Sequence, residues 1–150
     1  MRYLYSEAAT EQIMWSEGFA TGIAEVDNQH RIVVSLLDTL RRVVVDQRHH
    51  DQKDRLSLVL DQFNECASKL FLAEEKLMRE HLPNHPSTTG HIQSHLSYRR
   101  TVASYASQLR HGGNDLCEKL YDFLREWWMG HILTTDQEMG AALRALEAAA

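Results

Sequence analysis

The segment LSLVLDQFNECASKLFLAEEKL (56–77) decides the fold, because its apolar residues recur every three or four positions. This spacing puts them on one face of an α-helix, and such a face packs against other helices. The residues on this face are Leu56, Leu60, Phe63, Ala67, Leu70, Glu74 and Leu77. Glu74 is a carboxylate in an apolar row, and burying an ionised carboxylate costs roughly several kcal/mol without a partner. The segment therefore predicts a core-facing helix whose Glu74 meets a partner inside the protein.

Three further segments repeat this spacing, over residues 30–44, 91–109 and 116–131. Their core-facing residues are His30, Val33, Leu37, Leu40 and Val44 in the first; His91, His95, Tyr98, Val102, Tyr105 and Leu109 in the second; and Leu116, Leu120, Leu124, Trp127 and His131 in the third. The chain has only two prolines, and neither interrupts these segments. Short connections favour antiparallel neighbours. The sequence predicts an all-α, up-down-up-down antiparallel four-helix bundle over residues 25–147, preceded by an N-terminal arm over residues 1–24.

Capping and turn residues stand at the ends of the predicted helices. Asp27 is placed to cap the first helix, one of residues 87–89 the third, and Asn114 the fourth. A polar turn over residues 47–52 separates the first helix from the second. The arm offers three large apolar side chains that can hold it against the bundle: Trp15, Phe19 and Ile23. The last residues are expected to extend the final helix.

Composition argues against several classes of protein. The formal net charge is −5 and no long basic run occurs, so nucleic acid is not an expected partner. No apolar run approaches the ~18 residues of a membrane span, and the start lacks the layout of a signal peptide. Cys66 and Cys117 are isolated, which excludes a C-x-x-C zinc or redox motif. We expect a soluble, cytoplasmic protein with no membrane segment.

Polar residues stand at core-facing positions of all four predicted helices. They are His30, Glu74, His91, His95 and His131. Two of them, four residues apart, lie on one face of the same helix. A single buried histidine is more often a hydrogen-bonded core residue than a ligand, but this set needs a partner for every member. In an antiparallel bundle all five fall at the same end, where a metal ion would satisfy them together.

The types of side chain narrow the choice of metal. Imidazole and carboxylate without thiolate favour iron, manganese or zinc. Asp136 lies five residues past His131, which is ~140° further round a regular α-helix, at a height from which it can reach the same place. Several histidines with two carboxylates exceed the needs of one ion. We therefore expect two ions, bridged by Glu74 and Asp136.

The chain resembles the hemerythrin family, in its bacterial form, from Trp15 to about Met139. Four motifs carry the resemblance, with matching order and spacing: GIAEVDNQH (22–30), LFLAEEKLM (70–78), HIQSH (91–95) and WWMGHILTTD (127–136). The resemblance implies a non-haem di-iron centre inside the bundle. It assigns His91, His95 and His131 to one iron, Glu74 and Asp136 to the bridges, and His30 to the second iron, where O2 binds in the family.

The chain departs from the family pattern at two positions near the second iron. Leu70 stands where the family has a ligand histidine, four residues before the bridging glutamate. Trp128 stands where the family usually has a leucine that lines the O2 pocket. Water is the expected replacement for the missing imidazole, with His85 on the nearby turn as the other candidate. We expect Leu70, Trp128, Ile23 and Trp127 to line the ligand pocket, and the second ion to be held more weakly.

Three functions are compatible with these residues. The first is a binding protein that holds O2 or a related small ligand at a modified di-iron centre, in storage or sensing. The second is a redox enzyme that acts on peroxide or NO at the open iron. The third is a centre with a single iron, in a storage or structural role. The sequence favours the binding protein over an enzyme and names no protein partner.

Overall fold

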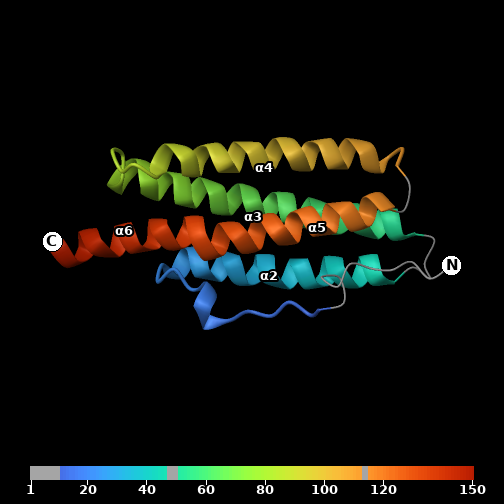
Figure 1. The fold of residues 1–150 in the computed structure, drawn as a ribbon, viewed down its shortest axis with the longest axis horizontal. Coiled ribbons are helices and arrows are strands. Elements are labelled where there is room, and N and C mark those ends of the chain that lie inside the picture. The colour runs from blue at the N-terminus through green and yellow to red at the C-terminus, as the bar shows by residue number, and fades with distance from the viewer. Residues whose placement is uncertain (1–10, 47–50, 113–114) are drawn as a thin grey trace.

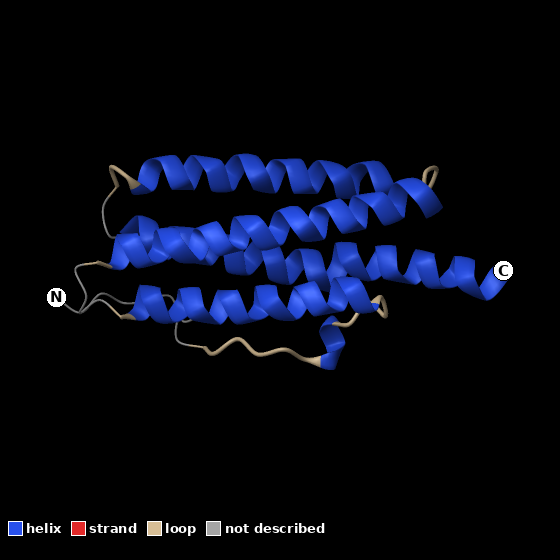
Figure 2. Cartoon of the chain, turned by 180° about the vertical axis from the view of Figure 1, so that it is seen from behind, coloured by secondary structure: helices blue, strands red, loops and turns tan. Residues whose placement is uncertain are grey.

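The computed structural model describes residues 11–46, 51–112 and 115–150, and Figure 1 shows its ribbon. The helices are α2 (Ala24–Val45), α3 (Gln52–His81), α4 (Thr88–Leu109), α5 (Asp115–Gly130) and α6 (Asp136–Ala149), with the 3-10 helix η1 (Glu17–Phe19) ahead of them and the π-helix η2 (His131–Thr135) between the last two. In Figure 1, α5 and α6 follow each other as one rod that lies alongside α2, α3 and α4. The described residues contain no strand (Figure 2), which confirms the predicted all-α four-helix bundle.

The core lies between these rods. Helix α2 packs against α3 and α5, and α4 packs against the same two helices. Most predicted core-facing residues are buried, but the face shifts by one position in two places. Met78 is buried where the half-buried Leu77 was predicted, and Trp128 is fully buried whereas Trp127 is only half-buried. Spacing alone therefore predicts which residues of a helix are buried only to within about one position.

The arm lies along α2 as far as its start. The backbone N–H of Ile13 donates to Asp38 Oδ1 at 3.2 Å, and the guanidinium of Arg31 stacks 4.7 Å from the Trp15 ring centroid. Phe19 packs against the core, and its carbonyl accepts a hydrogen bond of 3.1 Å from the side chain of Gln137. The arm therefore packs beside the first residues of α2 and the first residues of α6.

Asp27 stabilises the start of α2, but not from the predicted capping position. The helix begins at Ala24, so Asp27 lies within its first turn. Its carboxylate accepts hydrogen bonds from the backbone N–H and hydroxyl of Thr21, both at 2.7 Å, and from the N–H of Gly22 at 3.2 Å. Gly22 has φ +86°, a conformation that favours glycine, and this lets the arm turn back onto the carboxylate.

Other predicted helix ends meet mixed outcomes. Ser87 precedes α4 but makes no capping hydrogen bond, whereas the Thr88 hydroxyl donates to the carbonyl of Leu82 at 2.8 Å. Asn114 and most of the predicted 47–52 turn lie outside the described residues. The last residues do extend α6, as predicted. Within the part of the chain that the structure describes, no helix is long and apolar enough to cross a membrane.

Candidate metal centre

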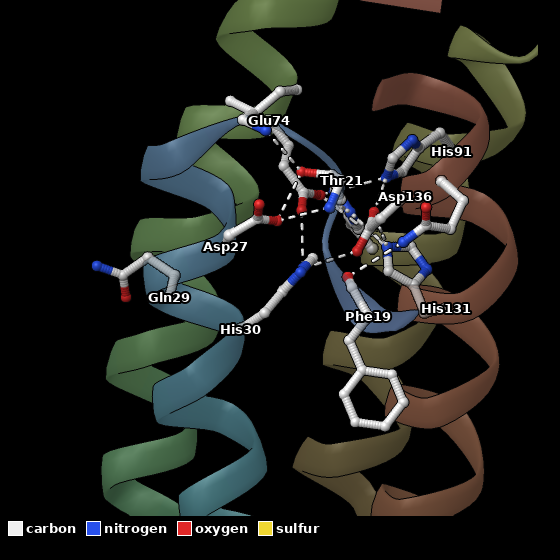
Figure 3. Close-up of polar contacts among 12 residues, drawn as sticks. Phe19, Thr21, Asp27, Gln29, His30, Glu74, His91, His131 and Asp136 are labelled. Atoms are coloured by element: carbon white, nitrogen blue, oxygen red, sulfur yellow. Dashed lines mark hydrogen bonds and ion pairs between the residues drawn. The ribbon is translucent and has the colours of Figure 1, made fainter. Parts of the chain in front are cut away.

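Six buried polar residues from all four rods meet inside the bundle, and Figure 3 labels all of them except His95. They are His30 from α2, Glu74 from α3, His91 and His95 from α4, His131 at the start of η2, and Asp136 at the start of α6. None is more than 5% exposed. These are the six ligand residues expected from the sequence, and the structure brings all of them together.

One part of the cluster is rich in nitrogen. The Nε2 atoms of His95 and His131 lie 3.2 Å apart. The Oε2 atom of Glu74 lies 3.2 Å from His91 Nε2 and 3.1 Å from His95 Nε2. Asp136 Oδ1 lies 3.1 Å from the Nε2 atoms of His91 and His131. We call this set of three imidazoles and two carboxylate oxygens the nitrogen-rich position.

The other part of the cluster is rich in oxygen. His30 Nε2 lies 2.9 Å from Asp136 Oδ2 and 3.6 Å from Glu74 Oε1. We call this set of one imidazole and two carboxylate oxygens the oxygen-rich position. Each carboxylate thus turns one oxygen toward each position, so Glu74 and Asp136 stand between the two sets of nitrogen atoms (Figure 3). Ligand atoms of Glu74, His91, His95 and His131 lie close enough together to hold one metal ion, and so do those of His30, Glu74 and Asp136.

Hydrogen bonds among the described residues do not satisfy these buried atoms. Both nitrogens of His30, Oε1 of Glu74 and both carboxylate oxygens of Asp136 have no hydrogen-bond partner there, although some lie within ion-pair distance. The close pairs that these particular atoms form, such as His30 Nε2 with Asp136 Oδ2, lack the alignment that a hydrogen bond requires. An unpaired buried polar group is costly, whereas a cation between the lone pairs would satisfy several at once. The donor set therefore fits a metal centre.

A π-helical turn brings Asp136 to the centre. Five residues along a regular α-helix would rotate Asp136 ~140° away from His131. The turn between them is the π-helix η2, in which residues five apart come to the same side. His131 Nε2 and Asp136 Oδ1 consequently both face the bundle interior, 3.1 Å apart. The sequence predicts that Asp136 reaches the metal from the side of a regular α-helix. In the structure the π-helix instead turns Asp136 to the same side as His131.

Residues outside the six predicted metal ligands orient the imidazoles. Glu75 Oε1 lies 3.1 Å from His95 Nδ1, on the ring edge away from the cluster. The rotation of 100° per residue, which turns Glu75 away from the position of Glu74, is what aims it at this second nitrogen. Phe71 stacks on the His95 ring at a centroid distance of 3.8 Å, and Trp127 stacks on His131 at 4.3 Å. The imidazoles are therefore held by packing as well as by the carboxylates.

The charges of the cluster shift its pKa values in opposite directions. Burial alone lowers the pKa of His30, but the nearby carboxylates of Asp136 and Glu74 outweigh it and raise the pKa to about 9. The same balance raises the pKa of His91 to about 9. Burial and the charge of Glu74 raise the pKa of Asp136, but the nearby imidazoles of His131, His30 and His91 outweigh both and hold it at about 2. A divalent cation bound here must displace the imidazole protons.

The four residues expected to line the ligand pocket do not all line the same space. Leu70 is fully buried one turn before Glu74. Trp128 is also fully buried, and its indole N–H donates to the Tyr98 hydroxyl at 3.0 Å. Ile23 lines a separate hollow of about 170 Å³ whose lining residues include none of the other three. Trp127 lies on the face of His131, as described above.

Neither histidine near the end of α3 reaches the metal-ligand groups. His85 Nδ1 lies 2.8 Å from the Ser87 hydroxyl, which holds the ring within the turn between α3 and α4. His81 is exposed near Glu80. Among the described residues, the groups close enough to hold an ion contain neither side chain.

Comparison with known proteins agrees with the resemblance seen in the sequence. The family model described as "Hemerythrin HHE cation binding domain" matches residues 21–143. A bacteriohemerythrin of Stenotrophomonas maltophilia is 26% identical over 133 residues, which cover 89% of this chain and 82% of the relative. A bacteriohemerythrin of Pseudomonas aeruginosa is 24% identical over 88% of this chain and 82% of its own length. One of Clostridium acetobutylicum is 22% identical over 83% of this chain and 96% of its own.

Proposed function

The chain belongs to the hemerythrin family, and we propose that it is a non-haem di-iron protein that binds O2 or a related small ligand. His91, His95 and His131 would hold one iron at the nitrogen-rich position. His30 would hold the second at the oxygen-rich position, with Glu74 and Asp136 bridging the two. Ferrous ions at these positions would supply electrons and an open coordination site for the small ligand.

One observation carries this proposal above the others. Both carboxylates of the cluster offer one oxygen to the three imidazoles and the other oxygen to His30. A centre for a single ion has no use for carboxylates that face two ways. The arrangement therefore favours two ions over the single-iron alternative.

The rest of the chain shelters this centre. Thr21 of the arm, with Leu70 and Trp128 one helical turn from the ligands, is fully buried. These side chains keep bulk water away from the cluster, and a dry surrounding strengthens electrostatic interactions at the metal and changes its redox behaviour. A small uncharged ligand suits a centre closed in this way better than a bulky or charged substrate.

Leu70 sets this protein apart within the proposal. A leucine offers no ligand atom, so the oxygen-rich position keeps one imidazole and two carboxylate oxygens, and we expect water to complete it. The second ion would then be held more weakly than the first. This open position also favours a second candidate function, the redox turnover of peroxide or NO, because more than one coordination site is left to exogenous ligands. We propose a cytoplasmic location for either function.

The test is an optical titration with O2 after anaerobic loading of Fe2+. Binding or reaction at a di-iron centre is expected to produce charge-transfer bands in proportion to added O2, with an end point set by the iron content. Titrations with hydrogen peroxide and with NO, each in the presence of an added chemical reductant, distinguish the redox enzyme, which would consume either reagent beyond the amount of bound iron. A loaded protein whose spectrum ignores all three reagents would contradict the proposal. Asp136→Asn, which removes the charge of one proposed bridge, should weaken these bands, whereas Glu138→Gln, on the exposed side of α6, is the matched control and should leave them unchanged.

A further inference from the structure

The two positions of the metal centre offer different kinds of donor. The nitrogen-rich position has three imidazole nitrogens, from His91, His95 and His131, beside one oxygen of each carboxylate. The oxygen-rich position has the imidazole of His30 and the remaining two oxygens. Only the carboxylates are shared. The two ions would therefore experience unlike surroundings although they are neighbours.

The structure also holds the two sets of imidazoles with different firmness. His95 is fixed at its second nitrogen by Glu75, 3.1 Å away. His131 Nδ1 lies 3.5 Å from the Ser94 hydroxyl. His30 Nδ1 is buried and has no hydrogen-bond partner among the described residues. A ligand histidine without such a partner is less firmly oriented and less basic, so the single imidazole of the oxygen-rich position is also its weakest feature.

No other described side chain adds nitrogen to the oxygen-rich position. Leu70 is fully buried on α3, one turn before Glu74, and its side chain carries no donor atom. His85 is held by Ser87, and His81 is exposed beyond the end of the cluster. Water is thus the remaining source of ligands, and water adds oxygen.

Donor type decides how strongly a position prefers one divalent ion to another. Imidazole suits iron and zinc, whereas carboxylate and water suit manganese. Affinity for a given site generally rises from Mn2+ to Fe2+, and three imidazoles enlarge that preference. A position of carboxylates, water and one loosely held imidazole keeps little of it. Availability of the metal then decides which ion binds there.

We infer that this centre accepts two different metals, with iron at the nitrogen-rich position and Mn2+ at the oxygen-rich position wherever manganese is the more abundant ion. The inference rests on the proposed two-ion centre and adds a metal that the proposal does not include. His30, Glu74 and Asp136 would be the ligands of Mn2+. Leu70 would be the residue that sets the preference, because it removes a nitrogen donor.

The experiment is a metal competition on the full chain. Metal-free protein receives, without O2, about two equivalents of Fe2+ together with a roughly tenfold excess of Mn2+. After gel filtration, mass spectrometry counts both metals, and electron paramagnetic resonance reports whether the retained Mn2+ is magnetically coupled to iron. We expect about one iron and one coupled manganese per chain. About two irons per chain, or manganese with the spectrum of an isolated surface ion, would overturn the inference.

Three variants test which residues determine the choice between iron and manganese at the oxygen-rich position. Leu70→His adds an imidazole and is expected to shift the ratio of iron to manganese at the second position on the order of tenfold toward iron. Leu72→His is the matched control, because Leu72 is 67% exposed on the same helix, and it should behave as the unmodified chain. His30→Ala should lose manganese and keep iron, which preserves a test if Leu70→His folds poorly. Loading with iron alone separates the two proposals, since two retained irons support the centre whatever the competition shows.

Discussion

Glu75 Oε1 lies 3.1 Å from Nδ1 of His95, while Nε2 of the same ring faces the metal cluster. Adjacent carboxylates on α3 therefore serve the same imidazole from two sides. Glu74 meets the nitrogen that would bind the metal, and Glu75 fixes the other one. A carboxylate at the second nitrogen orients a ligand histidine and makes it a stronger donor.

Removing this carboxylate is expected to weaken the nitrogen-rich position. Glu75→Ala should lower the affinity for the first iron ~10–100-fold, the usual size of such effects. Glu75→Gln should lose less, because the amide oxygen can still accept from Nδ1. Competition with a coloured chelator measures both. Glu80→Gln, exposed on the same helix, should match the unmodified protein, and equal affinities in all four chains would show that Glu75 has no such role.

Loss of His95 itself should be more severe. His95→Ala removes one of the three imidazoles of the nitrogen-rich position, so we expect metal content to fall sharply. The melting temperature should fall with it, because bound metal stabilises the folded state by linkage. Elemental analysis and calorimetry measure the two effects, with exposed His81→Ala as control. Full iron content with an unchanged melting temperature would remove His95 from the ligand set.

The stabilities of the metal-free and metal-loaded proteins should diverge as the pH rises. In the metal-free fold the pKa values of His30 and His91 are about 9, above the ordinary value of 6.5, so the charged forms of these side chains stabilise that fold. That stabilisation is complete below about pH 6.5 and disappears as the pH rises through about 9. Metal binding instead gains as those protons leave.

Thermal melts between pH 6.5 and 9 measure this divergence. The difference in melting temperature between loaded and metal-free protein should widen with pH by at least ~3 °C, which corresponds to ~1 kcal/mol in a chain of this size. A constant difference would show that the imidazoles of the cluster carry no proton that the metal displaces.

Leu70 and Trp128 are expected to make the reaction with O2 irreversible. Leu70 would leave a coordination position of the second ion open to water, and the bulk of Trp128, whose indole N–H donates to the Tyr98 hydroxyl, would crowd the ligand pocket. We expect the ferrous protein to oxidise in air rather than release O2 under vacuum. Leu70→His combined with Trp128→Leu should recover part of the reversible behaviour. Repeated, complete cycling of the charge-transfer bands in the unmodified protein would contradict this prediction.

The helical spacing of the sequence was enough for the fold and for the ligand residues to be proposed, because buried charge is rare and needs a reason. Four rods and their direction follow from apolar faces and short turns. The π-helix η2 could not be predicted, since nothing in HILTT (131–135) differs from an ordinary helical turn. It lies between His131 and Asp136, whose side chains contact Glu74 and His91 on other helices, and the local sequence does not contain those contacts.

Specific side-chain contacts between helices could not be predicted from the sequence either. The bond from Trp128 to Tyr98 joins α5 to α4, and the pair Glu75–His95 joins α3 to α4. Their geometry depends on how the rods are rotated about their axes, and helical spacing fixes that rotation only to within about one residue. Glu75 carried one available signal, its place beside Glu74, whose rotation aims it at the neighbouring helix.

The central claim is that Glu74 and Asp136 join two metal ions. Mössbauer and electron paramagnetic resonance spectra of the protein loaded with iron alone and then oxidised test it most directly, together with the iron content per chain. We predict about two irons per chain, magnetically coupled through the carboxylates, and no signal from isolated ferric iron. A single iron per chain with the spectrum of an isolated ferric ion would contradict the account.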